Sequence, residues 1–167
     1  EWFDNGRLRE HSIIQCSSPL KDKTLSTVTF WPNGKKRREL DWNNGVMHYR
    51  NYWNQRGGHT LVDGAGMITY KESEKRVAAE YKNGHCHGKT FIVSLKTNKV
   101  VLEQTFFTGE LHGITRRYFH SGRLEEESHY HHGKMIAQLD RKGVYREWCV
   151  NGGLKKEINL SRDIASR

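Results

Sequence analysis

Tyr81-Lys82-Asn83-Gly84 is the stretch that decides the fold: an aromatic residue, a polar spacer and an Asn-Gly pair. Asn and Gly both tolerate positive φ, which the two central residues of a type I′ turn require, and this turn joins antiparallel strands. An aromatic residue followed within a few positions by Gly recurs along the whole chain. The sequence therefore predicts hairpin turns at seven glycines: Gly34, Gly45, Gly84, Gly109, Gly122, Gly133 and Gly152.

The spacing of these turns defines a repeat. Gly122 and Gly133 are eleven residues apart, which leaves a segment long enough for a strand and too short for a typical helix. Gly84, Gly109 and Gly133 follow one another at intervals of 25 and 24 residues. A period of this length fits one two-stranded unit, repeated along the chain.

Alternation within the segments supports strands. Val77, Ala79 and Tyr81 fall on one face of such a strand, because successive side chains of a strand point to opposite faces. Three stretches break the pattern. Residues 17–22 contain Pro19 and are expected to form a loop, residues 57–66 are rich in glycine and suggest a distorted turn or exposed loop, and residues 135–140 resemble an insertion.

The predicted fold class is therefore all-β, an elongated and twisted antiparallel sheet of consecutive β-hairpin repeats, with essentially no helix. Residues 1–158 are expected to form a single repeat array whose regular part covers about 27–158, and residues 159–167 a C-terminal tail. Hydrophobic residues make up 35% of the chain and aromatic residues 11%, so aromatic side chains must supply much of the buried area.

Two stretches carry a family resemblance, residues 81–88 and 107–113. Tyr81-Lys82-Asn83-Gly84-His85-Cys86-His87-Gly88 and Phe107-Thr108-Gly109-Glu110-Leu111-His112-Gly113 resemble the MORN repeat, in which an aromatic residue and Gly precede a His-Gly pair. The aromatic-Pro-Asn-Gly turn and the eleven-residue spacing are most similar to the bacterial MORN variant of YwqK-family antitoxins. The resemblance implies consecutive hairpins and a role in protein contacts, scaffolding, dimerisation or phospholipid binding. The antitoxin comparison implies neutralisation of a toxin by binding.

The charge of the chain favours an acidic partner. The formal net charge is +9 and the pI is about 9.6. Lys35-Lys36-Arg37-Arg38 is the densest basic run, and Arg116-Arg117 occupies a corresponding later position. Such residues would form a basic stripe for nucleic acid or anionic lipid, or they would be solvated strand charges that protect sheet edges.

The cysteines and the apolar runs bear on localisation. Cys16, Cys86 and Cys149 are odd in number and widely spaced, which argues against a disulfide framework and favours a reducing, cytoplasmic compartment. No apolar run approaches the roughly 20 residues of a membrane span, and the first residues do not resemble a signal peptide. Because the chain opens on a turn motif, we expect a signal sequence, an anchor or earlier repeats to precede it.

No catalytic set, cofactor motif or metal site is predicted. The chain has no Gly-x-Ser-x-Gly elbow and no phosphate-binding loop, and Cys86 cannot easily reach its strand neighbours His85 and His87. His129 and His131, like His85 and His87, share a strand face at a ligand-like separation. No carboxylate or cysteine pair completes a tetrahedral set around either pair, and packing explains the His-Gly histidines His87 and His112.

The function predicted from the sequence is a non-catalytic protein-interaction module, as an antitoxin, immunity or scaffold protein, with a toxin or assembly component as partner. The alternative is binding of nucleic acid or phospholipid through the basic stripe. Self-association through the sheet ends is a further expectation. Aromatic and basic residues dominate binding hot spots. The candidate partner-binding residues are Trp31, Lys36, Arg38, Phe107, Arg116, Arg117 and Tyr118.

Overall fold

Every element named in the described chain is a β-strand. The computed structural model describes residues 1–14, 25–43, 45–149 and 151–160. The loop predicted at 17–22, Cys16 and the tail from residue 161 onward lie outside these residues. The strands are β1 (Glu10–Ile14), β2 (Leu25–Phe30), β3 (Lys36–Asn43), β4 (Val46–Trp53), β5 (His59–Val62), β6 (Ala65–Glu72), β7 (Lys75–Lys82), β8 (His85–Ser94), β9 (Val100–Phe107), β10 (Glu110–Leu111), β11 (Gly113–Tyr118), β12 (Leu124–His131), β13 (Lys134–Leu139), β14 (Val144–Trp148) and β15 (Leu154–Asn159).

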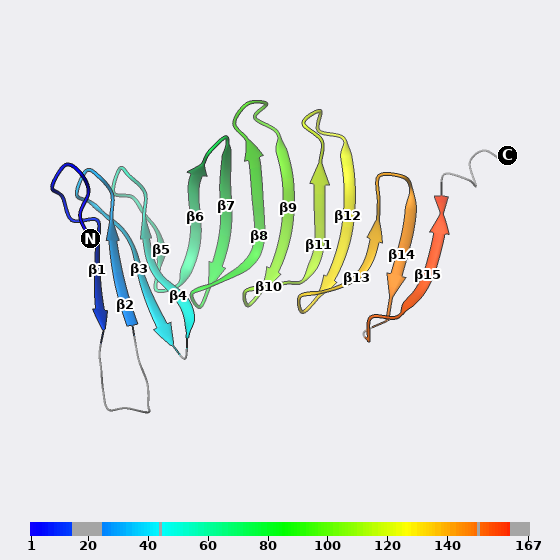
Figure 1. Cartoon of the computed structure of the whole chain (residues 1–167), viewed down its shortest axis with the longest axis horizontal. Helices are drawn as coiled ribbons and strands as arrows, with labels where there is room; N and C mark the ends of the chain where they lie inside the picture. Colours follow the sequence, from blue (N-terminus) through cyan, green and yellow to red (C-terminus); the bar gives the residue numbers. More distant parts are fainter. Residues whose placement is uncertain (15–24, 44, 150, 161–167) are drawn as a thin grey trace. The chain divides into compact units, whose positions relative to one another are not determined.

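Consecutive strands pair with one another in one antiparallel sheet (Figure 1). The order follows the sequence from β1 to β15, except that the two-residue strand β10 pairs with β9 beside the path from β9 to β11. This arrangement confirms the prediction of an all-β fold made of consecutive hairpins. The chain divides into two compact units, Glu1–Thr69 with Glu80–Cys86, and Tyr70–Ala79 with His87–Arg167.

Among the described residues, four narrow hairpin turns have positive φ at both central positions. Asn83 and Gly84 have φ values of 52° and 78°, so both central residues are left-handed, as the type I′ prediction requires. The pairs Asp63-Gly64, Thr108-Gly109 and His132-Gly133 also have positive φ at both positions. Aspartate, asparagine and histidine adopt this conformation more readily than most residues, whereas the β-branched Thr108 does so at a higher cost.

Other turns are wider, and they correct the turn type predicted for Asn33-Gly34. The Trp31 carbonyl accepts the Gly34 N–H at 2.8 Å, and the Trp31 N–H donates to the Lys35 carbonyl at 2.8 Å. Only Gly34 of the Asn-Gly pair is left-handed, and the register shifts between Thr29 and Phe30. This is a type I turn followed by a bulge, which a short sequence motif does not distinguish from type I′.

All seven glycines predicted to lie in turns have positive φ. Their values run from 74° at Gly133 to 90° at Gly122. Gly152 resembles Gly34, because the Cys149 carbonyl accepts the Gly152 N–H at 2.8 Å and the Cys149 N–H donates to Gly153. The chain therefore uses turns of two lengths while the strands keep their order.

Two predicted irregularities are regular strands instead. Residues 57–66 contain β5, where Leu61 has no exposed surface and pairs with Tyr52 on one side and Gly66 on the other. Residues 135–140 contain most of β13, which pairs with β12 and β14. The composition of both segments resembles a loop or an insertion, but neighbouring strands supply the hydrogen-bond partners that make them strands.

The two units differ in the kind of side chain that they bury. In the first unit the buried side chains are mostly apolar, and they are Leu40, Tyr52, Leu61 and Ile68, with Thr29 as the polar exception. In the second unit several buried side chains are small or polar, and they are Val77, Ala79, Thr90, Ser94, Ser128 and Ala137. Tyr52 is the only aromatic residue in the buried class among the described residues. Most other aromatic side chains are half-buried, so each keeps part of its surface exposed.

Candidate functional site

The predicted basic run has partners within the protein. Lys35 Nζ donates to the Arg56 carbonyl at 2.9 Å, and Lys36 Nζ lies 2.8 Å from Glu39 Oε1. The Arg37 guanidinium lies 4.6 Å from the centre of the Trp31 ring, a cation–π contact. Arg38 Nη1 donates to the Tyr49 hydroxyl at 3.4 Å. The run therefore joins neighbouring strands and turns, and its charge is only partly available to a partner.

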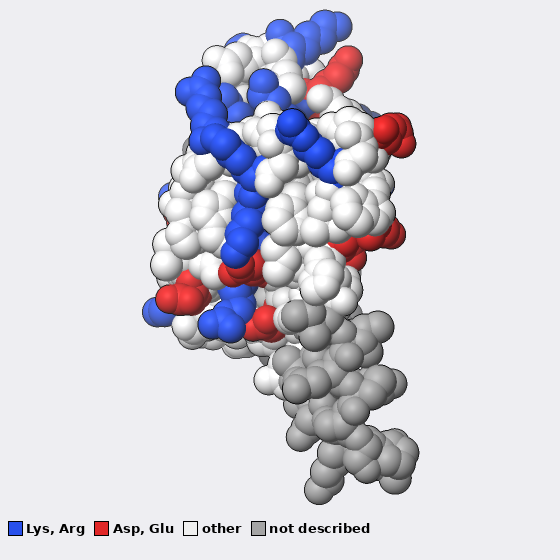
Figure 2. Space-filling view, turned by 90° about the vertical axis from the view of Figure 1, so that its left-hand side faces the viewer, with Lys and Arg blue, Asp and Glu red and all other residues white. Residues whose placement is uncertain are grey.

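Charges of both signs share the surface at this side of the chain. Figure 2 shows Lys and Arg side chains in a broken line, with Asp and Glu side chains between and beside them. The Lys36–Glu39 pair is one reason, and a second is Arg50, whose Nε lies 3.4 Å from Asp41 Oδ2. The interruption favours the interpretation of these residues as strand charges over that of a continuous basic stripe.

Trp31, Lys36 and Arg38 belong to the first unit, and the other four predicted residues to the second. Trp31 is half-buried, and its Nε1 donates to the Trp53 carbonyl at 2.9 Å, so its polar edge is occupied. Phe107 is 48% exposed and contacts the rings of His87 and His112. The sequence prediction therefore selects two separate groups of residues.

Arg116 lies between two carboxylates. Its Nε is 2.8 Å from Glu127 Oε2, and its Nη1 is 3.8 Å from Glu103 Oε2. Tyr118 donates from its hydroxyl to the same Glu103 oxygen at 3.1 Å, and burial together with this bond raises the pKa of Tyr118. The hydrogen bond to Glu127 raises the pKa of Arg116. Arg116 and Tyr118 thus form an internal network, and neither side chain presents its polar group freely.

This network predicts a pH dependence of stability. The hydrogen bond from His129, and then those from Arg116, lower the pKa of the Glu127 carboxyl below its usual range. Glu127 therefore stabilises the fold above its unfolded pKa, and this stabilisation is lost as pH falls through its lowered folded pKa. We expect Glu127→Gln to reduce the free energy of unfolding by about 1 kcal/mol at pH 7 and to match the wild type near pH 3.

Urea denaturation across this pH range measures the effect. Glu72→Gln, which removes an exposed carboxylate from β6 of the same unit, controls for the change in net charge. A difference between Glu127→Gln and the wild type that stays constant down to pH 3 would contradict the assignment.

Arg117, the neighbour of Arg116, points to the other face of the sheet. It pairs in register with Leu102 of β9, and Leu102 pairs with Ile92 of β8, so the three side chains form one row across three strands. Ser94, two positions beyond Ile92, is buried on the same face. Among the described residues no salt bridge involves Arg117, and its side chain is exposed. The row therefore combines two apolar side chains with one available guanidinium.

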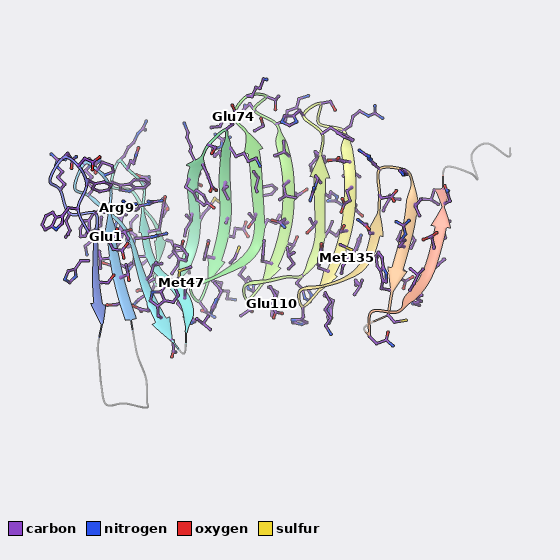
Figure 3. All side chains as sticks on the ribbon, in the orientation of Figure 1. Glu1, Arg9, Met47, Glu74, Glu110 and Met135 are labelled. Atoms are coloured by element: carbon purple, nitrogen blue, oxygen red, sulfur yellow. The ribbon has the colours of Figure 1, made fainter. Side chains whose placement is uncertain are left out.

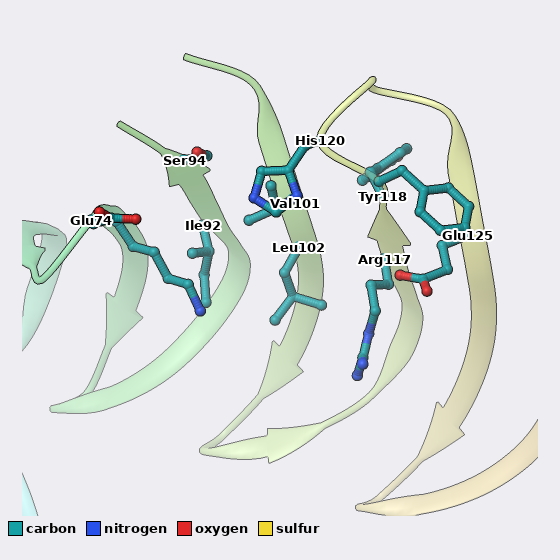
Figure 4. A pocket seen from close by; sticks show the side chains of 11 residues that line it. Glu74, Ile92, Ser94, Val101, Leu102, Arg117, Tyr118, His120 and Glu125 are labelled. Atoms are coloured by element: carbon teal, nitrogen blue, oxygen red, sulfur yellow. The ribbon is translucent and has the colours of Figure 1, made fainter. Parts of the chain in front are cut away.

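A groove of about 570 Å³ lies over this row, and we call it the Arg117 groove. Figure 4 shows Ile92, Leu102 and Arg117 rising from neighbouring strands on its floor. Two turns contribute its ends, the one between β6 and β7 and the one between β11 and β12. The lining residues are Glu74, Lys75, Ile92, Ser94, Val101, Leu102, Arg117, Tyr118, Phe119, His120 and Glu125.

The turns at the ends of the groove are fixed by hydrogen bonds. The Leu95 N–H donates to the Glu74 carbonyl at 2.8 Å, which joins the β6–β7 turn to the end of β8. Lys99 Nζ donates to the Ser121 carbonyl, which joins the β8–β9 turn to the β11–β12 turn. Phe119 is 39% exposed on that last turn. The groove is therefore a preformed surface with an exposed aromatic ring and an exposed arginine.

Of the sequence-predicted residues, Arg117 and Tyr118 line this groove, and Arg116 and Phe107 do not. Sequence reasoning missed Phe119, Ile92 and Leu102 as members of the same surface. The only signal in the sequence was the pair of adjacent aromatic residues Tyr118-Phe119. The pairing of β8, β9 and β11 cannot be read from that signal.

The predicted histidine pairs separate into different contacts. His85 packs against His48 in the first unit with ring centres 4.3 Å apart, and burial lowers the pKa of His85. His87 in the second unit packs on Phe107, and its Nδ1 accepts the Thr108 N–H at 3.4 Å. His129 Nε2 lies 2.9 Å from Glu127 Oε1. His85, His87 and His129 therefore each have a structural partner.

Comparisons with protein-family models and with curated proteins found no match to this chain. Within the described residues, no helix has the length and apolar character needed to cross a membrane. The likeness to MORN repeats therefore rests on the motifs of the sequence.

Proposed function

We propose that this chain is a non-catalytic protein-interaction module built of MORN-like hairpin repeats, and that the Arg117 groove is its docking surface. The observation that carries the proposal is the row Ile92, Leu102 and Arg117, an apolar floor with an exposed guanidinium that has no salt bridge among the described residues. Arginine and aromatic residues contribute most of the energy at protein interfaces. Through such binding the protein would act as an antitoxin, an immunity protein or a scaffold protein.

The groove favours a protein segment with an apolar side chain next to a carboxylate. Ile92 and Leu102 bury the apolar group, and Arg117 forms a bidentate pair with the carboxylate. Phe119, at the end of the groove, adds apolar contact area. A ligand with phosphates alone would leave the apolar floor uncovered. The internal pairing of Lys36 and Arg116 also weakens the case for nucleic acid or phospholipid.

Replacing Arg117 by Glu is expected to abolish capture of the protein partner. The full chain is immobilised, proteins retained at a stoichiometric level are identified, and the dissociation constant of that partner is measured for each variant. Loss of a central arginine contact costs about 2 kcal/mol or more, which is at least a 30-fold rise in the dissociation constant. Phe119→Ser should also raise the dissociation constant of the partner.

Lys96→Glu makes the same charge change on an exposed turn of the same unit that does not line the groove, and it should leave the affinity unchanged. Equal affinity of the wild type and Arg117→Glu would contradict the assignment of the groove. Salt-dependent binding to an oligonucleotide or to anionic vesicles, lost in the Lys36→Glu, Arg38→Glu double variant, would instead support the basic-stripe alternative.

A further inference from the structure

Three histidine rings gather beside the β12–β13 turn in the second unit. His112 precedes β11, His131 ends β12, and His132 is the first residue of the turn. The ring centres are 4.9 Å apart for His112 and His131, 4.9 Å for His112 and His132, and 4.7 Å for His131 and His132. One nitrogen from each ring lies within 4.8 Å of the other two. We infer that His112, His131 and His132 bind a divalent transition-metal ion of the zinc class.

Backbone pairing holds the three residues together. The Gly133 N–H donates to the Leu111 carbonyl at 2.8 Å, which joins the β12–β13 turn to β10. This bond brings residues about twenty positions apart in the sequence to the same end of the strands. Figure 3 shows Glu110 at the end where the β9–β10 turn lies. The cluster is therefore fixed by the sheet and does not depend on a mobile segment.

Glu110 orients one of the three rings. Its Oε2 lies 3.2 Å from His132 Nδ1, so a protonated Nδ1 donates to the carboxylate and Nε2 keeps the lone pair that a metal ion requires. A carboxylate in this position is a recurrent outer partner of metal-binding histidines. The His132 N–H approaches His112 Nδ1 at 3.5 Å, a long and weak hydrogen bond. Because this hydrogen bond is weak, breaking it costs little free energy when His112 turns a ring nitrogen toward a metal ion.

Small movements are enough to complete the site. Nitrogen ligands at about 2.0–2.1 Å from a tetrahedral zinc ion lie about 3.3 Å from one another. The three nitrogens here need to approach by about 1.5 Å at most from their limit of 4.8 Å. His131 and His132 are exposed, so their side chains rotate without disturbing a core. Imidazole ligands suit zinc, copper and nickel, whereas magnesium and calcium prefer oxygen.

Three ligands leave a fourth position open. A cavity of about 460 Å³ borders His131 and His132 and is also lined by Cys149. Water fills the fourth position in a site of this kind, and the cavity gives it access to solvent. The metal ion is thus held at an open surface site, and the site is independent of the Arg117 groove.

Isothermal titration of the chelator-treated full chain with zinc chloride at pH 7.5 tests this inference. We expect one ion per chain with a micromolar dissociation constant and no response to magnesium. Cobalt should give the intense visible absorption of a tetrahedral site. Affinity should fall as the pH is lowered, because a protonated imidazole cannot bind a metal ion.

The variants are chosen so that folding is preserved. His131→Ala removes an exposed ring, and His132→Asn keeps a residue that tolerates the positive φ of 45° at that position. Each should lower the affinity for zinc at least 100-fold. Glu110→Gln should lower this affinity 10-fold to 100-fold, while the stoichiometry stays at one zinc ion per chain. His11→Ala, at an exposed position of β1, should leave binding unchanged.

Two results would overturn the inference. The first is zinc binding with the wild-type affinity in both His131→Ala and His132→Asn, confirmed as folded by circular dichroism. The second is a wild-type dissociation constant in the millimolar range, which would mean that the rings only pack on one another and on Phe107.

Discussion

Gly64→Ala should destabilise the first unit by about 3–5 kcal/mol, the largest effect that we expect from a single methyl group in this chain. A Cβ at Gly64 would lie 2.4 Å from the Gly84 nitrogen and 3.1 Å from its Cα, and these are backbone atoms that cannot rotate away. The φ of +77° adds a conformational cost. Chemical denaturation followed by circular dichroism measures the change.

The close approach exists because narrow turns of successive hairpins contact each other. The Gly64 N–H donates to the Arg50 carbonyl at 2.7 Å, and the Gly64 carbonyl accepts the Gly84 N–H at 2.9 Å. The Gly84 carbonyl then accepts the Tyr49 N–H at 3.0 Å. A methyl group at Gly64 must break this chain of bonds or move a hairpin, and buried backbone groups would lose their partners.

Gly45→Ala is the matched control. Gly45 has nearly the same φ, +78°, but a Cβ there would meet no atom within 4 Å. The substitution should therefore cost only the left-handed strain of about 1–2 kcal/mol. The difference between the two variants isolates the contact between the turns. Equal destabilisation of the two variants would show that Gly64 and Gly84 do not approach each other closely in solution.

Leu61→Ala should have the second large effect, a loss of about 2–5 kcal/mol. Leu61 has no exposed surface and lies in β5, between Tyr52 and Gly66. Its truncation leaves a cavity that the fixed backbone of a sheet cannot fill, so the cost includes both lost burial and lost packing. Denaturation and hydrogen exchange of the β4 and β5 amides measure the loss.

Val62→Ala is the control for this prediction. Val62 follows Leu61 in the same strand, points to the other face and is 48% exposed. We expect it to lower the free energy of unfolding by less than about 1 kcal/mol. If Leu61→Ala were equally mild, residues 57–66 would be the exposed loop that their glycine content suggests, and β5 would not be a core strand.

The sequence predicted the hairpins because their determinants are local. The Asn83-Gly84 pair encodes its own turn, and the alternation of Val77, Ala79 and Tyr81 encodes a strand within a few residues. The same local information failed at residues 57–66. There Gly64 is required by a contact with another hairpin, because a Cβ at Gly64 would lie against the backbone nitrogen of Gly84.

The candidate site was only partly predictable. Arg117 and Tyr118 were selected from the sequence, but the apolar floor of Ile92 and Leu102 depends on the register of β8, β9 and β11. The basic run shows the opposite failure. Its charges look available in the sequence, whereas Lys35 donates to the Arg56 carbonyl in the turn between β4 and β5, and Lys36 pairs with Glu39 of its own strand. Histidine pairs were sought along one strand, and the cluster of His112, His131 and His132 forms across two hairpins.

The sequence by itself determined the all-β class, the positions of the turns and the period of the repeat, because turn chemistry and side-chain alternation act over a few residues. Only the tertiary structure decided which turns are narrow or wide, which cations are neutralised and which rings meet. Those outcomes depend on register, since a shift of one residue moves every side chain to the opposite face. Register is set by bulges and by backbone hydrogen bonds between successive hairpins. The Gly84 N–H donates to the Gly64 carbonyl and the Gly133 N–H to the Leu111 carbonyl, so each bond joins residues about twenty positions apart.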